Sequence, residues 1–389
     1  MPRIDEKKLI NMIKEKGQSW KAGRTSLSEL PFEEQKKRLG LAVKKEDLEK
    51  MRLEIKAAVK AFSFPQEWDW RNARGKNWTT SIKDQSSCGS CVSFAVCAVM
   101  ESMMKIEEDK HDLSIDLSEA HLFFCGCGRC CNTGWTFEPA LDYAKGDGIS
   151  DEACFPYRAT DTNCNERCSD WDKRSSKITE WKKITNVSER KNVLSSVGPL
   201  VGGMAVYEDF FSYRGGVYRH VTGDFAGYHA IAIVGFSESE QCWICKNSWG
   251  SGWGENGWFK IGYGECDIDT TFPMYSVTGI VPAPPQPPQP ECLIATAAYG
   301  SVLSPEVQFL RDVRDNIVRK TEKGNKFMDD AEYVYYKFSP QVVYHMKRSK
   351  NFKKFVRWTV VAPFVYSVYG IMRVLVDDER LDKYNLDET

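Results

Sequence analysis

The feature that most constrains this chain is a polar loop that runs directly into a long apolar segment. Residues 85–90 read Gln-Ser-Ser-Cys-Gly-Ser, and the apolar residues of 92–104 predict a buried helix. Cys91 then lies at the N-terminus of that helix, where unpaired N–H groups favour a thiolate over a thiol. Because only the thiolate attacks, Cys91 is a candidate nucleophile.

Three further residues have the chemistry that a cysteine nucleophile needs, namely a base and a donor for the oxyanion. Gln85 lies six residues before Cys91, so its amide can reach the same pocket as the Cys91 N–H. His229 stands in an apolar run that predicts a buried strand, which holds it on rigid scaffold. Asn247 belongs to a glycine-rich turn with two Trp residues, where it can accept the second imidazole N–H and orient the ring.

These blocks, in this order, resemble the papain-like cysteine proteases, in which His and Asn follow the Cys by about 130–150 residues. His229 lies 138 residues after Cys91, and Asn247 lies 156 after it. The resemblance covers residues 62–280. It implies that Cys91 is the nucleophile, His229 the acid and base, Asn247 the orienting residue and Gln85 the oxyanion donor.

One residue departs from the family pattern, and one alternative stays open. The family usually has an aromatic residue after the nucleophile, where this chain has Val92, so we expect weaker shielding of the ion pair. The alternative is that Cys91 is a structural cysteine and that the site is catalytically silent.

The resemblance implies an α+β, papain-like two-domain fold, with a helical left domain and an antiparallel β right domain. Residues 1–61 carry 16 Lys and Arg against 10 Asp and Glu, and contain a Trp20-x-Ala22-Gly23 motif similar to the cathepsin B propeptide. A soluble helical cap is the alternative for this segment. The expected parts are an N-terminal helical inhibitory propeptide (1–61), a catalytic domain (62–281), a proline-rich linker (282–290) and a helical C-terminal domain resembling the CFI-box domain (291–389).

The resemblance also implies where substrate is bound. Counting from Cys266 makes Thr271 the floor of the S2 pocket, although a shift of two residues would place Asp269 there. A neutral floor favours Leu, Val or Phe over Arg at P2, because burying an unpaired Arg is costly. Residues 142–168 contain no His, which favours an endopeptidase over an enzyme that removes C-terminal dipeptides. The expected substrate-binding residues are Gly134, Trp135, Gly203, Ala230, Trp249 and Thr271.

Fourteen Cys residues imply several disulfides, and hence an oxidising compartment or a thermophile's cytosol. The resemblance implies a disulfide between Cys88 and Cys131, whereas the pairing of Cys154, Cys164 and Cys168 stays open. The cysteine-rich run 125–131 has zinc binding as an alternative interpretation. The cysteine content favours a secreted, cell-surface or lysosome-like location, although the charged start of this chain shows no signal peptide.

The expected partners are a peptide or protein substrate and the chain's own propeptide. A formal net charge of −1 gives no reason to expect nucleic acid. Residues 359–372 are apolar and follow a basic stretch, which predicts either a core helix of the C-terminal domain or peripheral contact with an anionic membrane.

The sequence therefore predicts a hydrolase, a cysteine endopeptidase made as an autoinhibited zymogen, that requires no metal or organic cofactor. The alternative from a different class is a catalytically silent, peptidase-like binding module that is tethered by its C-terminal domain.

Overall fold

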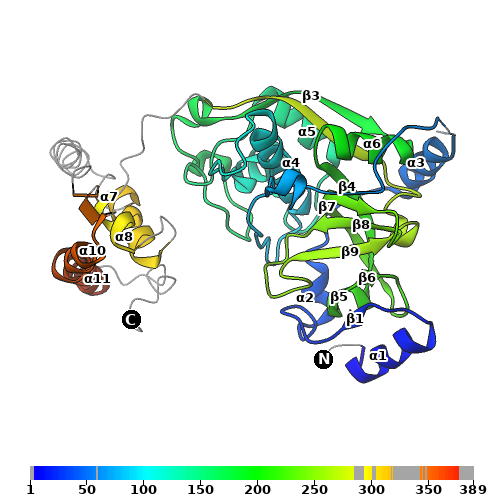
Figure 1. The fold of residues 1–389 in the computed structure, drawn as a ribbon, viewed down its shortest axis with the longest axis horizontal. Helices are drawn as coiled ribbons and strands as arrows, with labels where there is room; N and C mark the ends of the chain where they lie inside the picture. The colour runs from blue at the N-terminus through cyan, green and yellow to red at the C-terminus, as the bar shows by residue number, and fades with distance from the viewer. Residues whose placement is uncertain are drawn as a thin grey trace. The chain divides into compact units, whose positions relative to one another are not determined.

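The computed structural model describes residues 4–57, 60–283, 293–299, 304–316, 318, 342–343, 345–346 and 348–375. The chain divides into two compact units, Met1–Pro284 and Pro285–Thr389 (Figure 1). The N-terminal segment, defined here as residues 4–57, belongs to the first unit together with the expected catalytic domain.

A buried helix, α4 (Cys91–Glu107), is the centre of the first half of the expected catalytic domain. Every residue from its start to Lys105 is buried, as expected for a segment so rich in apolar side chains. The shorter helix α5 (Phe137–Gly146) and the π-helical turn η2 (His121–Cys125) contribute to the same core. Glu101 is the fully buried acid of α4, and Lys83 compensates its charge at 3.1 Å.

The second half is an eight-stranded sheet, so the fold is α+β, as predicted. All paired strands are antiparallel except β6 and β9, a parallel pair that the sequence did not predict. The strand order is β3 (Lys177–Ile184), β10 (Met274–Val281), β4 (Leu200–Tyr207), β7 (Phe225–Ser237), β8 (Cys242–Lys246), β9 (Trp258–Gly262) and β6 (Val217–Tyr218), with β2 (Glu67–Asp69) also on β7. Helix α6 (Val187–Ser196) follows β3 in the chain.

The N-terminal segment is bound to this half through its Trp20-x-Ala22-Gly23 motif. Trp20 is buried, with its ring centroid 5.1 Å from that of Tyr218. The elements of the segment are α1 (Glu6–Glu15), β1 (Lys21–Ala22), α2 (Phe32–Lys36) and α3 (Lys45–Ala57), and β1 pairs antiparallel with β5 (Tyr213–Gly215). At its far end, Glu54 of α3 lies 2.7 Å from Lys183 of β3. The segment therefore contacts both outer strands of the sheet order, β6 through Trp20 and β3 through Glu54 (Figure 1).

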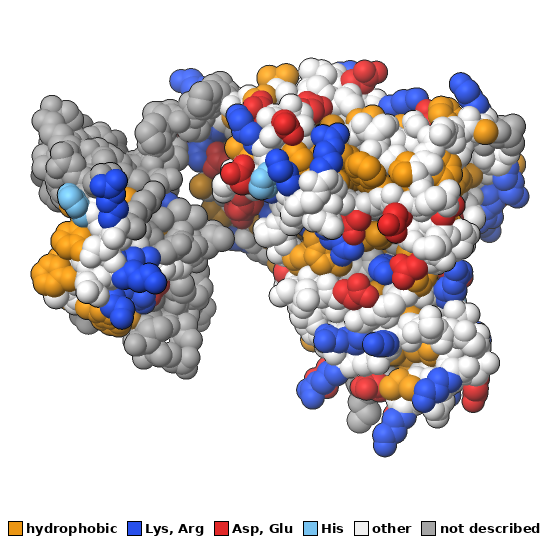
Figure 2. All heavy atoms as spheres, in the orientation of Figure 1, with side chains coloured by type: hydrophobic (Ala, Val, Ile, Leu, Met, Phe, Trp, Pro, Cys, Tyr) orange, Lys and Arg blue, Asp and Glu red, His pale blue; other side chains and the backbone are white. Residues whose placement is uncertain are grey.

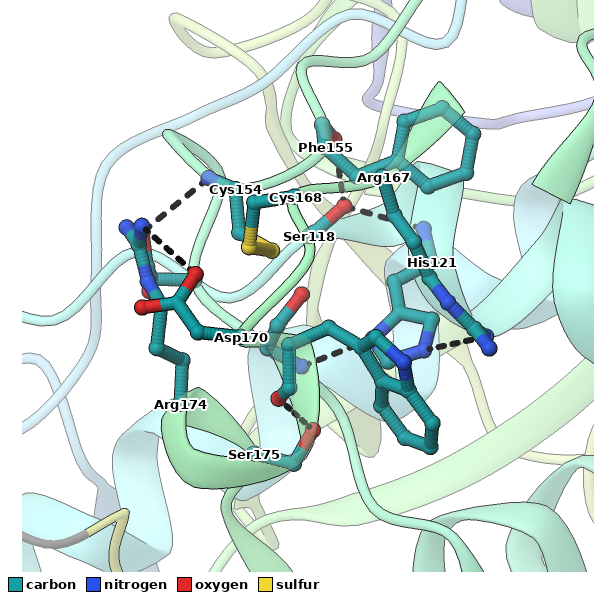
Figure 3. Close-up of a disulfide and its surroundings, with 12 residues drawn as sticks. Ser118, His121, Cys154, Phe155, Arg167, Cys168, Asp170, Arg174 and Ser175 are labelled. Atoms are coloured by element: carbon teal, nitrogen blue, oxygen red, sulfur yellow. Dashed lines mark hydrogen bonds and ion pairs between the residues drawn. A yellow bond between two sulfur atoms is a disulfide. The ribbon is translucent and has the colours of Figure 1, made fainter. Parts of the chain in front are cut away.

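Four disulfides crosslink the helical half, all between residues 88 and 168. They are Cys88–Cys131, Cys125–Cys164, Cys127–Cys130 and Cys154–Cys168. All four cysteines of the run 125–131, for which zinc binding was the alternative interpretation, are thus paired in disulfides. Figure 3 shows Cys154–Cys168 near His121 and Arg167. The pKa of His121 is lowered to about 4, mainly by burial and further by the Arg167 charge.

The described residues of the second unit are mostly helical, as predicted for a C-terminal domain. Its elements are α7 (Leu293–Tyr299), α8 (Pro305–Asn316), α10 (Lys350–Val356), the π-helical turn η8 (Arg357–Val361) and α11 (Ala362–Leu375). They share a small core that includes Ala298, Phe309 and Val365. Most of the predicted proline-rich linker, residues 284–290, lies outside the described residues. Within the described part, no helix combines the length and apolarity required to cross a membrane.

Candidate active site

Cys91 is the first residue of α4 and is completely buried beneath the N-terminal segment. The Ala230 N–H donates to its Sγ at 3.4 Å. Burial raises the pKa of the Cys91 thiol to about 11, although backbone N–H groups, first that of Ala230 and then that of Gly40, act to lower it. The helix N-terminus was expected to favour a thiolate, but in this covered site desolvation is the larger effect.

His229 and Asn247 lie on neighbouring parts of the sheet and are hydrogen-bonded. His229 belongs to β7, Asn247 follows β8, and the imidazole Nε2–H donates to Asn247 Oδ1 at 2.8 Å. The Trp249 ring centroid is 4.7 Å from that of His229 and helps to exclude water. Because Nε2 carries the proton, Nδ1 of the neutral ring is an acceptor. Nδ1 is buried, and no solvent reaches it in this covered site.

The electrostatics of His229 reflect its complete burial. Burial lowers the pKa of its imidazole to about 4, against the hydrogen bond to Asn247 and the Arg38 carbonyl, which raise it. With the pKa of Cys91 raised and that of His229 lowered, both groups are neutral near pH 7 while the N-terminal segment covers them.

The side chain of Gln85 is fixed at both ends of its amide. Its Nε2 donates to the Arg38 carbonyl at 3.0 Å and to the Cys88 carbonyl at 2.8 Å. Its Oε1 accepts from Ser248 Oγ at 2.6 Å. The amide N–H that was predicted to hold an oxyanion therefore contacts a carbonyl of the N-terminal segment. Sequence analysis missed Ser248, although it directly follows Asn247 in the motif.

Gly40 passes through a gap that only glycine can fill. A Cβ at Gly40 would overlap the Gly89 carbonyl, and a Cβ at Gly134 would overlap the carbonyl of Gly40. The Trp135 N–H donates to the Gly40 carbonyl at 2.8 Å, and the Ala42 N–H donates to the Trp135 carbonyl at 2.9 Å. Gly134, one of the expected substrate-binding residues, thus permits the close approach, while the backbone hydrogen bonds are made by Trp135.

Leu41 occupies an apolar pocket beside Cys91. Its side chain is buried, and its N–H donates to the Tyr228 carbonyl at 3.2 Å. Gly203 leaves the space that Leu41 fills, since a Cβ there would lie 2.7 Å from Leu41 Cδ2 and 3.0 Å from Phe272 Cδ1. Gly203 and Phe272 are therefore part of the lining of this pocket.

The two residues that sequence counting considered for the pocket floor both have hydrogen-bond partners of their own. Thr271 is buried, donates its hydroxyl to Asp267 at 2.6 Å and accepts from Arg52 Nε at 3.4 Å. Asp269 accepts from the indole N–H of Trp243 at 2.9 Å. Positive φ angles at two consecutive residues, Cys266 and Asp267, make a local turn that spacing from Cys266 does not reveal.

The other His of this half, His220, belongs to a separate cluster. Its Nδ1 lies 3.1 Å from the buried carboxylate of Asp209, and its ring stacks on Tyr207 with centroids 4.0 Å apart. These contacts leave His220 half-buried.

Residues 64–276, more than half of the chain, match the family described as papain family cysteine protease. The chain therefore belongs to the papain family of cysteine proteases, which are hydrolases. It is 31% identical to ananain of Ananas comosus over 220 residues, which cover 55% of this chain and 60% of ananain. It is 30% identical to cathepsin B-like cysteine proteinase 2 of Haemonchus contortus over 248 residues, which cover 53% of this chain and 71% of that protein.

Among solved structures, proCathepsin B S9 from Trypanosoma congolense aligns with a TM-score of 0.59 at 24% sequence identity. The alignment covers 72% of this chain and 99% of that one. At this identity the likeness supports the fold alone.

Proposed function

We propose that this protein is a cysteine endopeptidase and that residues 1–61 inhibit it until they are removed. The observation that carries the proposal is the position of residues 38–42. They contact the Gln85 amide and the Cys91 thiol, and they pair with the backbone of Trp135. The same groups are those that a peptide substrate needs, so the bound segment excludes substrate.

In the uncovered site, the Cys91 thiol transfers its proton to His229 Nδ1 and the thiolate attacks the carbonyl carbon of the substrate. The Gln85 Nε2–H and the Cys91 N–H stabilise the oxyanion that forms. His229 then donates its proton to the departing amine, and the C–N bond breaks. Water, deprotonated by His229, releases the acyl group from Cys91 as a carboxylic acid. Side chains and water supply every proton in these steps, so the proposal includes no cofactor.

Removal of the N-terminal segment is expected to change the charge state of the catalytic pair. Burial under this segment keeps both the thiol and the imidazole neutral. Exposure to water removes part of that desolvation, so the pKa of Cys91 falls and that of His229 rises. Both shifts favour a thiolate–imidazolium pair near pH 7.

Reactivity of Cys91 separates a peptidase from a silent binding module. We expect an epoxide that alkylates thiols to label Cys91 at least about tenfold faster after cleavage near residue 61 than in the intact chain, because thiolate attacks and thiol does not. Mass spectrometry of the labelled peptides gives the rate, and His229→Ala in the cleaved chain is the control. A cleaved chain that labels no faster than its His229→Ala variant would support the binding module.

The Leu41 pocket leads to a prediction for specificity. A reporter peptide with Leu at P2 should have a kcat/KM at least about tenfold higher than an otherwise identical peptide with Arg. The pocket that Leu41 fills is lined by apolar groups, and burying a Leu side chain contributes about 1.5–3 kcal/mol. Paired kinetics on the cleaved chain measure the ratio. A faster Arg peptide would mean that an acidic side chain, such as that of Asp269, reaches the pocket.

A further inference from the structure

The second unit contains a stretch of unusual charge. Residues 333–376 include eight Lys and Arg and not one Asp or Glu, in a chain whose totals of 53 and 54 are balanced. Four of the eight, Lys350, Lys353, Lys354 and Arg357, lie in the first turns of the continuous helical segment formed by α10, η8 and α11. The basic charge is therefore concentrated at one end of this helical segment.

The same helical segment has apolar side chains that are exposed in the described part of the chain. Val356, Val361 and Val365 point into the core of the unit. The residues directly before them, Phe355, Val360 and Phe364, are 59%, 56% and 59% exposed. With Phe352 and Trp358, they make up five of the eight large hydrophobic residues found exposed in the described part of the chain. We call these five residues the aromatic face.

The basic groups and the aromatic face are adjacent. The Arg357 guanidinium lies over the rings of Tyr299, at 4.6 Å, and Trp358, at 5.2 Å. Figure 2 shows hydrophobic and basic side chains next to one another on the surface of this unit. Apolar and aromatic side chains beside Lys and Arg are the pattern of helices that lie in the interface of an anionic membrane.

We propose that the aromatic face docks the protein on the surface of an anionic lipid bilayer. The aromatic side chains enter the boundary between headgroups and acyl chains, and the Lys and Arg side chains pair with lipid phosphates. Charge distinguishes this occupant from a second copy of the chain. Two copies joined through this face would bring two basic stretches together, whereas an anionic bilayer neutralises them.

Sedimentation with vesicles tests the proposal on the full chain, in which Cys91→Ser prevents self-cleavage. The protein should bind vesicles of phosphatidylcholine mixed with phosphatidylglycerol and should not bind phosphatidylcholine alone. Binding should weaken as salt is raised, because the headgroup contacts are screened. Equal binding to both kinds of vesicle, or binding to neither, would overturn the proposal.

Two variants show whether the aromatic face is responsible. Phe355→Ser with Trp358→Ser should reduce vesicle affinity at least about tenfold, since two large apolar side chains no longer enter the membrane. Leu53→Ser, at a residue 66% exposed on α3, is the matched control and should bind as the parent does. Circular dichroism checks that the helices persist. Unchanged binding of the double variant would exclude this face, and a dimer lost in that variant would identify a second copy as the occupant.

Discussion

The Gly40→Ala chain is expected to be active without being cut. Its added Cβ would overlap the Gly89 carbonyl, which is backbone and cannot rotate aside as a side chain could. Overpacking of this kind costs about 1–3 kcal/mol, which corresponds to a shift of about 5- to 150-fold toward an open cleft. The kcat/KM of the intact chain on a reporter peptide should rise by that factor, with gel electrophoresis confirming that the chain stays whole.

Gly146→Ala provides the matched control for this experiment. Gly146 ends α5, its backbone is not left-handed, and a Cβ there meets nothing within 4 Å. This variant should keep the low activity of the intact parent. If Gly40→Ala and Gly146→Ala are equally inactive while intact and equally active after cleavage, residues 38–42 do not control the site.

The second large effect is expected from Gln85→Ala in the cleaved enzyme. Loss of one oxyanion donor lowers kcat by about 10²–10³ in proteases, because the interaction is made in the transition state. KM should change little, and labelling of Cys91 by a thiol alkylator should continue, since the thiolate and His229 are untouched. Steady-state kinetics and labelling rates on the same preparation separate these outcomes.

Ser248→Ala distinguishes donation by Gln85 from its positioning. This change removes the hydroxyl that donates to Gln85 Oε1 at 2.6 Å but leaves the Nε2 donor in place. We expect a much smaller loss of kcat than for Gln85→Ala. Equal losses in the two variants would mean that the amide is not the oxyanion donor and that the Gln85 side chain acts through packing.

The sequence predicted those site residues whose position depends on the few residues next to them in the chain. Cys91 could be placed at a helix start because the apolar run after it is long, and the structure begins α4 at that residue. The glycine-rich turn around Asn247 and the apolar strand around His229 likewise identify their own local structure. His229 Nε2 and Asn247 Oδ1 lie 2.8 Å apart because the strands that carry or precede them, β7 and β8, are paired in the sheet.

The part that could not be predicted depends on contacts between distant segments. Nothing near Gly40 in the sequence indicates that it fits between Gly89 and Gly134, since its need for glycine comes entirely from those neighbours. Similarly, Phe272 was not identified as a lining residue, because Gly203 and Leu41, with which it shares this pocket, are distant in the sequence. The sequence predicted a thiolate at Cys91, whereas burial keeps the thiol neutral in the covered site. The segment that buries Cys91 lies about 50 residues earlier in the chain, so the sequence around Cys91 did not reveal it.

The placement of the disulfides limits the redox conditions in which this protein can work. Cys88, three residues before the proposed nucleophile, is bonded to Cys131, which precedes the Gly134–Trp135 wall of the cleft. The proposed mechanism needs Cys91 as a free thiol, whereas the Cys88–Cys131 bond beside it exists only while both of its cysteines are oxidised. A strong reductant would release that wall from the nucleophile loop, and a strong oxidant would cap the nucleophile. We therefore expect the highest activity at an intermediate thiol–disulfide balance, with a separate cause for the decline of activity on each side.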